Sequence, residues 1–152
     1  MLCFVRMDLG RQKFIAMDVN LLSQLFPSEL IEYFEITHVE TFLDEERKQE
    51  YLVIEFEERN DLPEGFSTSD YESKGFMESR RIQDFPLRGK PVFLKVKKRR
   101  WRHKETGEVV KRDFTFMADG SKFTRELSDF LKDAGGYANR YHEQHSQLLR
   151  GE

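Results

Sequence analysis

Nine lysine and arginine residues lie between Arg88 and Lys104, and no acidic residue interrupts them. Apolar residues alternate with the first of these cations, and Trp101 lies in the most highly charged part. Cations at this density neutralise phosphates, and an aromatic ring among them can stack on a base or a sugar. The segment therefore predicts binding of a nucleic-acid backbone rather than conversion of a small substrate.

The same segment has the pattern of a β-hairpin. Residues 105–108 predict a turn in which Gly107 tolerates a positive φ, and the chain returns over residues 109–116. The first half of the outgoing strand is expected to pack on the core, and the second half to project as a two-sided cationic finger. Two interpretations of Trp101 stay open, because its ring can either touch nucleic acid or cap the core. For the whole finger, the alternative is an edge strand that carries cations to prevent edge pairing.

The candidate DNA-binding residues are the cations of this hairpin, two rings among them and the start of a later helix. The predicted phosphate ligands are Lys95, Lys97, Lys98, Arg99, Arg100, Arg102, Lys104, Lys111 and Arg112. Trp101 and His103 are expected to touch bases or sugar. Lys122, Thr124 and Arg125 lie at a predicted helix start, where backbone N–H groups favour anions.

No pattern for catalysis or metal binding accompanies the cations. The chain lacks a glycine-rich phosphate loop and a Ser-His-Asp order, and its one cysteine, Cys3, cannot form an internal disulfide or a cysteine zinc site. His142 and His145 lie in a polar tail, where a solvated surface is the favoured interpretation. We therefore predict no enzymatic activity, no cofactor and no bound metal.

The net charge of −3 over 152 residues conceals a separation of charge along the chain. Residues 29–64 hold thirteen acidic and three basic residues, whereas residues 88–112 hold eleven basic and two acidic ones. One interpretation is that the acidic half neutralises the basic half within the molecule. The other places the acids on a solvated sheet face, because they alternate with apolar residues.

The totals favour a cytoplasmic protein without membrane contact. No apolar run approaches the roughly 20 residues that span a bilayer, and the first residues lack the pattern of a signal peptide. A single cysteine is compatible with a reducing compartment.

Periodicity along the chain predicts an α+β domain over residues 17–133, between a poorly defined arm (1–16) and a polar helical tail (134–152). We expect helices over residues 20–26 and 28–34 on either side of Pro27, and a hairpin of strands over 36–43 and 49–59. A strand over 71–85, bulged at Gly75, precedes the basic hairpin, and Ser121 is expected to cap a helix that ends near Asp133. The predicted fold is an antiparallel sheet of about five strands with a projecting basic hairpin, an N-terminal helical pair and one or two C-terminal helices.

Short motifs downstream of residue 82 resemble the N-terminal region of bacterial insertion-sequence transposases. The motifs are Ile82-Gln83-Asp84-Phe85-Pro86, Gly89-Lys90-Pro91-Val92, Leu94-Lys95-Val96, Arg99-Arg100-Trp101-Arg102 and Phe114-Thr115-Phe116. Residues 21–40 resemble the start of a subgroup whose transposase is split between two reading frames. His103 stands where the family has a cysteine of its zinc ribbon, so residues 82–116 are similar to a zinc ribbon that has lost its metal.

The resemblance implies that the chain binds double-stranded DNA at the terminal inverted repeats of an insertion sequence. It also implies a separately encoded catalytic transposase subunit as partner, because the matched region has no catalytic acids. Residues 121–133 would then be the first helix of a helix-turn-helix, with residues 137–149 as a weak second helix.

Two alternatives remain from the residues themselves. In the first, the acidic hairpin and the N-terminal helices form a protein–protein interaction module, and the basic finger is only a charged edge. In the second, the same cations bind RNA rather than DNA.

Overall fold

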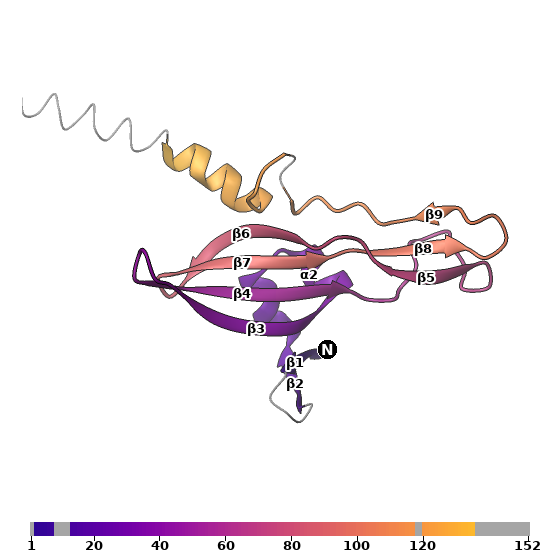
Figure 1. Ribbon diagram of the computed structural model, residues 1–152, viewed down its shortest axis with the longest axis horizontal. Coiled ribbons are helices and arrows are strands. Elements are labelled where there is room, and N and C mark those ends of the chain that lie inside the picture. Colours follow the sequence, from indigo (N-terminus) through magenta and orange to yellow (C-terminus); the bar gives the residue numbers. More distant parts are fainter. Residues whose placement is uncertain (1, 8–12, 118–119, 136–152) are drawn as a thin grey trace, which may run out of the picture.

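The protein has an α+β fold, shown in Figure 1 as a computed structural model that describes residues 2–7, 13–117 and 120–135. Side chains are described from residue 18 onward within these ranges. In chain order the elements are β1 (Leu2–Met7), β2 (Lys13–Asp18), α1 (Val19–Leu25), α2 (Ser28–Tyr33), β3 (Phe34–Asp44), β4 (Gln49–Glu58), β5 (Tyr71–Phe76), β6 (Arg80–Leu87), β7 (Lys90–Lys97), β8 (Arg99–His103) and β9 (Val109–Val110). A further helix covers residues 125–135.

The strands form two sheets. A six-stranded sheet has the order β2-β1-β3-β4-β7-β6, and a three-stranded sheet has the order β5-β8-β9. Figure 1 shows the smaller sheet extending from one end of the larger one. The larger sheet is mixed, because β1 pairs with β3 and β4 pairs with β7 in parallel. The α+β class is confirmed, but the expected antiparallel sheet is wrong in this respect, because residue alternation does not reveal strand direction.

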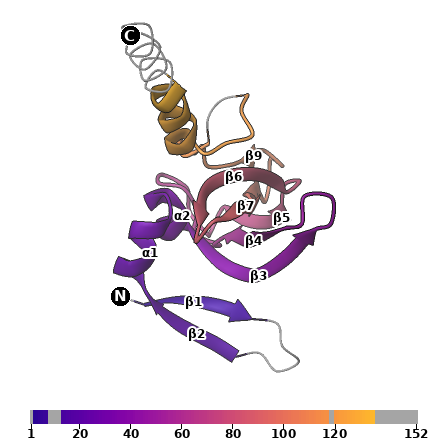
Figure 2. The ribbon, with the colours of Figure 1, turned by 90° about the vertical axis from the view of Figure 1, so that its left-hand side faces the viewer.

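The core lies between one face of the larger sheet and the two short helices. Alternate residues of β4 and β7 are buried, and they pack with Leu22, Leu30 and Ile31 of α1 and α2. The ring of Phe26 meets Phe56 edge-on at a centroid distance of 5.4 Å. Figure 2 shows α1 and α2 on one side of the sheet and the helix of residues 125–135 beyond β6.

The N-terminal helical pair is confirmed, and its boundaries have local causes. The side chain of Asp18 accepts a hydrogen bond of 2.7 Å from the backbone N–H of Asn20 and so caps α1. Pro27 separates the helices, because it has no N–H to donate, and α2 begins at the next residue. None of the described helices is long and apolar enough to cross a bilayer.

The predicted hairpin of β3 and β4 and the bulge at Gly75 are also confirmed. Gly75 has a φ of 81°, and the β5–β8 register shifts between Ser73 and Phe76. The single strand predicted over residues 71–85 is two strands in different sheets, since β5 pairs with β8 whereas β6 pairs with β7. The bulge bends the chain where it leaves the smaller sheet.

The predictions for the two ends of the chain have mixed outcomes. The expected arm contains β1 and β2, which pair in antiparallel orientation. The hydroxyl of Thr124, rather than that of Ser121, accepts a bond from Leu127 N–H at the start of the C-terminal helix. The hydroxyl of Ser121 accepts from Phe123 N–H within the preceding turn. The predicted tail beyond residue 135 lies outside the described residues.

Replacement of Phe56 by alanine tests the position of the core. Phe56 is fully buried (0% exposed), so Phe56→Ala is expected to lower the free energy of unfolding by about 3 to 5 kcal/mol in urea denaturation. Phe66→Ala is the matched control, because Phe66 is exposed and its removal is expected to cost about 1 kcal/mol or less. Equal losses in the two variants would contradict this core.

Candidate nucleic-acid interface

The basic segment changes its inward face between β7 and β8. In β7 the buried residues are Val92, Leu94 and Val96, whereas in β8 the buried residue is Trp101. Lys98 lies between the two strands, and this irregular residue shifts the alternation by one position. Trp101 is consequently 1% exposed, and its Nε1 donates a hydrogen bond of 3.0 Å to Oδ1 of Asn60. The structure favours the core-capping interpretation, since such burial leaves no ring face for a base.

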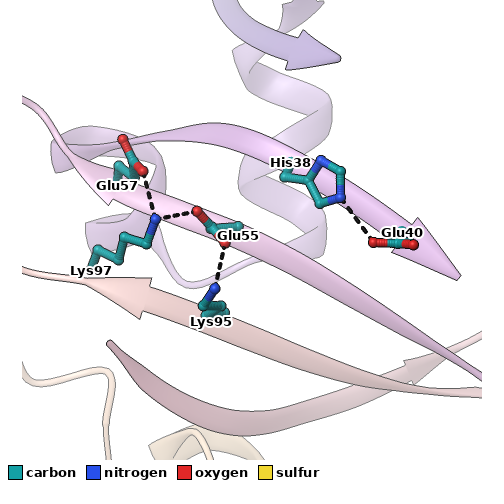
Figure 3. Close-up of polar contacts among 6 residues, drawn as sticks. All are labelled: His38, Glu40, Glu55, Glu57, Lys95 and Lys97. Carbon is teal, nitrogen blue, oxygen red and sulfur yellow. Dashed lines mark hydrogen bonds and ion pairs between the residues drawn. The ribbon is translucent and has the colours of Figure 1, made fainter. Parts of the chain in front are cut away.

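The cations of β7 are paired with the carboxylates of β4. The parallel register places Glu55 opposite Lys95 and Glu57 opposite Lys97. Nζ of Lys95 lies 2.9 Å from Glu55, and Nζ of Lys97 contacts Glu57 at 2.9 Å and also Glu55 (Figure 3). Burial disfavours the charged form of Glu55, but the bonds from Lys97 and Lys95 outweigh it and lower the pKa of this carboxyl. These lysines are therefore neutralised within the sheet.

A buried carboxylate, Glu58, binds the backbone of Arg99 and the side chain of Arg112. Its side chain is 0% exposed and accepts bonds of 2.8 Å from Arg99 N–H and from Nη1 of Arg112. Burial raises the pKa of Glu58 and outweighs the bond from Arg99 and the charge of Arg112. The Arg112 guanidinium also lies 4.2 Å from the ring centroid of Tyr33. Sequence reasoning missed this role, although the alternation placed Glu58 on the same face as Ile54 and Phe56, where a charged group needs a partner.

The Arg99 side chain lies in the contact between the two sheets. Its Nε donates to the carbonyl of Glu58 at 3.0 Å, and its Nη1 donates to the hydroxyl of Ser73 at 2.8 Å. The guanidinium lies 4.4 Å from the ring centroid of Phe76. With these bonds made, Arg99 serves to join the two sheets.

The residues at the far end of the hairpin are bound to neighbouring loops. Arg102 forms an ion pair with Glu72, and Lys104 donates to the carbonyls of Thr68 (2.8 Å) and Ser69 (2.7 Å). Nδ1 of His103 accepts bonds from the backbone N–H groups of residues 105 and 106. The predicted turn is confirmed, with Gly107 at a φ of 74°, but β8 lies between β5 and β9 rather than projecting as a free finger.

Four of the predicted phosphate ligands form neither an ion pair nor a side-chain hydrogen bond with the described residues: Lys98, Arg100, Lys111 and Lys122. The side chains of Arg99 and Lys104 also lack a carboxylate partner, but they donate hydrogen bonds to carbonyl or hydroxyl oxygens. Burial lowers the pKa of Lys98. The charges of Asp113 and Glu58 raise this pKa and those of Lys111 and Arg80 lower it, but the net shift is downward. Nε of Arg100 is buried without a hydrogen-bond partner in the described part of the chain. These cations are the ones left for an external anion.

The predicted site at the C-terminal helix start is not assembled as an anion site. Thr124 is buried, and its hydroxyl donates a bond of 2.8 Å to Oδ1 of Asp84 on β6. Nε of Arg125 donates to the carbonyl of Thr115 at 2.7 Å. Of these three residues, only Lys122 has a side chain that is exposed and forms no hydrogen bond or ion pair with the described residues. Thr124 therefore holds the C-terminal segment against β6, and Arg125 holds it against the segment of residues 115–117.

No group of three or more His, Cys, Asp and Glu side chains that could hold a metal ion is present among the described residues. Comparison with protein-family models, with curated proteins and with solved structures finds no match to this chain.

The burial of Trp101 predicts its fluorescence. It is the only tryptophan in the chain, so the emission reports on this position alone. We expect blue-shifted emission and weak quenching by acrylamide in the native protein, with a red shift and strong quenching in urea, because unfolding exposes the indole. Strong quenching of the native protein would contradict the buried position.

The buried Asp84 predicts a pH dependence of stability. Burial raises its pKa above 3.8 and outweighs the bonds from Thr124 and the Phe85 backbone. At a pH between the unfolded-state pKa of 3.8 and the higher folded-state pKa, Asp84 binds more protons in the folded chain than in the unfolded chain. The stability that Asp84 contributes by protonation is therefore complete at low pH and declines as the pH rises. The unfolding free energy of the wild type, relative to Asp84→Asn, should therefore fall with rising pH over this interval. Urea denaturation from pH 3 to pH 7 measures it, and a constant difference would refute the assignment.

Proposed function

We propose that this protein is a DNA-binding accessory, the N-terminal region of a split insertion-sequence transposase. It binds double-stranded DNA at the terminal inverted repeats and leaves strand transfer to a separately encoded catalytic subunit. The observation that carries the proposal is the group of ribbon cations that form neither an ion pair nor a side-chain hydrogen bond with the described residues: Lys98, Arg100 and Lys111. The resemblance of residues 82–131 to such proteins supports the same function.

The electrostatics around Lys98 support phosphate as the ligand. Burial is the main cause that disfavours the charged form of Lys98, and repulsion from Lys111 and Arg80 adds to it against the attraction of Asp113 and Glu58. A phosphate placed among the three cations relieves this repulsion and favours the protonated lysine. A small number of such contacts gives salt-dependent binding of modest affinity.

A second candidate function is a protein–protein module, and neutralisation of the ribbon favours it. Glu55, Glu57 and Glu72 already occupy cations that were expected to bind DNA. Exposed apolar side chains occur on α1 at Leu21 and Leu25. In this alternative the acidic β3–β4 hairpin and the helices α1 and α2 form the surface that docks the catalytic subunit. The RNA-binding alternative uses the same free cations and differs only in the nucleic acid.

The proposal predicts salt-dependent binding of labelled duplex DNA, measured by fluorescence anisotropy. The triple variant Lys98→Ala, Arg100→Ala and Lys111→Ala should bind all duplexes more weakly, and the slope of log affinity against log salt should decrease by about one for each lost phosphate contact. The matched control replaces Lys48, Arg88 and Lys90, because these residues lie at the β3–β4 and β6–β7 turns and their loss removes the same charge. Figure 1 shows both turns at the end of the larger sheet that lies away from the smaller sheet.

Equal loss in the triple variant and the control would show only an effect of net charge and would sink the assignment of the site. No duplex binding at low salt would sink the DNA proposal for this chain. In that case, binding of the purified catalytic subunit, weakened by Leu21→Glu with Leu25→Glu, would support the protein–protein module. Preference for duplex RNA over duplex DNA would replace DNA by RNA as the ligand.

A further inference from the structure

The face of the larger sheet opposite the core carries a continuous group of aromatic rings. Phe42 on β3 stacks on Tyr51 on β4 with centroids 5.4 Å apart and an interplanar angle of 20°. Tyr51 meets Phe93 on β7 edge-on at 5.7 Å. The core helices pack on the other face, where Ile54, Phe56 and Leu94 lie. Three strands thus present one aromatic surface. Figure 2 shows that α1 and α2 lie together on one side of these strands, which is the side of the core.

An arginine from the fourth strand completes this surface. The guanidinium of Arg81 on β6 lies 4.2 Å from the ring centroid of Phe93 and 5.5 Å from that of Tyr51. Gln83, two residues further along β6, pairs directly with Phe93 across the ladder and lies on the same face. Aromatic rings on adjacent strands, with a guanidinium over them and a side-chain amide beside them, have the features of a surface on which nucleobases stack.

Two hollows of about 450 and 420 Å³ lie on this surface and share Arg81, Gln83 and Phe93. The first extends past Tyr51 to Gln49 and the β3–β4 turn, and the second extends to Lys122 and Phe123. Since they share three residues, they form one groove that crosses the strands. The volume of each hollow is within the range of pockets that hold a ligand of about the size of one nucleotide.

The charges along the groove favour a polyanion. Arg47, Arg81 and Lys122 line it, against one half-buried carboxylate, Asp44. One oxygen of Asp44 accepts bonds from the backbone N–H groups of residues 46 and 47, and the other lies 3.9 Å from Nε of Arg47. The uncompensated cations are therefore Arg81 and Lys122, on the side of the groove toward the C-terminal helix.

We infer that this groove binds single-stranded DNA, at a site distinct from the ribbon that is proposed to bind duplex. Unpaired bases stack on Tyr51 and Phe93 with Arg81, and the phosphates follow Arg81 and Lys122. The amides of Gln49 and Gln83 can donate to and accept from base edges. The choice of DNA over RNA rests on the proposed function, whereas the stacking site itself does not. An unpaired strand is required, because a base within a duplex does not offer its ring faces.

The test is anisotropy of a labelled oligothymidine of about ten nucleotides, which is within the range bound by single-strand domains. Wild-type protein should bind it, and Tyr51→Leu with Phe93→Leu should weaken binding by about tenfold for each ring that stacks on a base. Leucine keeps apolar area on the sheet while removing the ring. Arg81→Gln with Lys122→Gln changes only exposed side chains, should fold as the wild type does, and should also weaken binding.

The matched control is Phe66→Leu with Tyr71→Leu, because these two rings also meet edge-on, at 5.1 Å, but Tyr71 belongs to the smaller sheet and Phe66 to the loop before it. It should bind oligothymidine like the wild type. Equal weakening in the control and in the Tyr51 and Phe93 variant would overturn the site. So would unchanged binding in both the aromatic and the cation variants.

Duplex binding separates this inference from the proposed function. The Tyr51 and Phe93 variant should bind duplex DNA like the wild type, and loss of duplex binding in parallel would overturn a separate site. If duplex binds but oligothymidine does not, the groove is no single-strand site and the proposed function stands. If oligothymidine binds through the rings but duplex DNA does not bind, the groove is a single-strand site and the proposed function fails. Tighter binding of oligouridine of the same length would overturn the choice of DNA.

Discussion

The parallel pairing of β4 with β7 is the constraint on which the remaining structure depends. It places the acidic strand of the first hairpin directly beside the first strand of the basic segment, with Glu55 opposite Lys95 and Glu57 opposite Lys97. The same register brings Ile54 and Phe56 beside Leu94 and Val96 on the buried face. One pairing therefore joins the core, aligns opposite charges on the outer face and leads the chain toward Glu58, whose burial would be unfavourable without Arg99 and Arg112.

Local patterns of the sequence predicted much of the fold. The helix boundaries around Pro27, the β3–β4 hairpin, the bulge at Gly75 and the turn at Gly107 follow from residues close together in the chain, so their causes are visible in the sequence. The parallel register of β4 and β7 was not predicted, because alternation defines which residues share a face but not which strands become neighbours. The division of residues 71–87 between two sheets has the same cause.

The candidate site could be predicted less well, because charge in a sequence does not indicate its partner. The cation cluster was identified correctly as a cluster, but its internal ion pairs depend on the register of β4 with β7 and of β5 with β8. Strict alternation from Val92 would place Trp101 on the face opposite the core, but the irregular residue Lys98 shifts it to the buried face, so the two interpretations of Trp101 could not be separated from the sequence. Tyr51 and Phe93 belong to strands that were recognised, but their meeting on the outer face required the strand order.

The long segment between β4 and β7 determines the order in which contacts can form during folding. The β3–β4 hairpin closes over a four-residue turn, whereas Glu55 and Lys97 are separated by 42 residues along the chain. Closure of the longer loop costs more chain entropy, so the acidic hairpin is expected to form before its counter-charges arrive. During that interval Glu55 and Glu57 are hydrated like-charged neighbours on one strand. Repulsion between these carboxylates and those of a second copy disfavours edge-to-edge pairing of the exposed hairpin until β7 is in place.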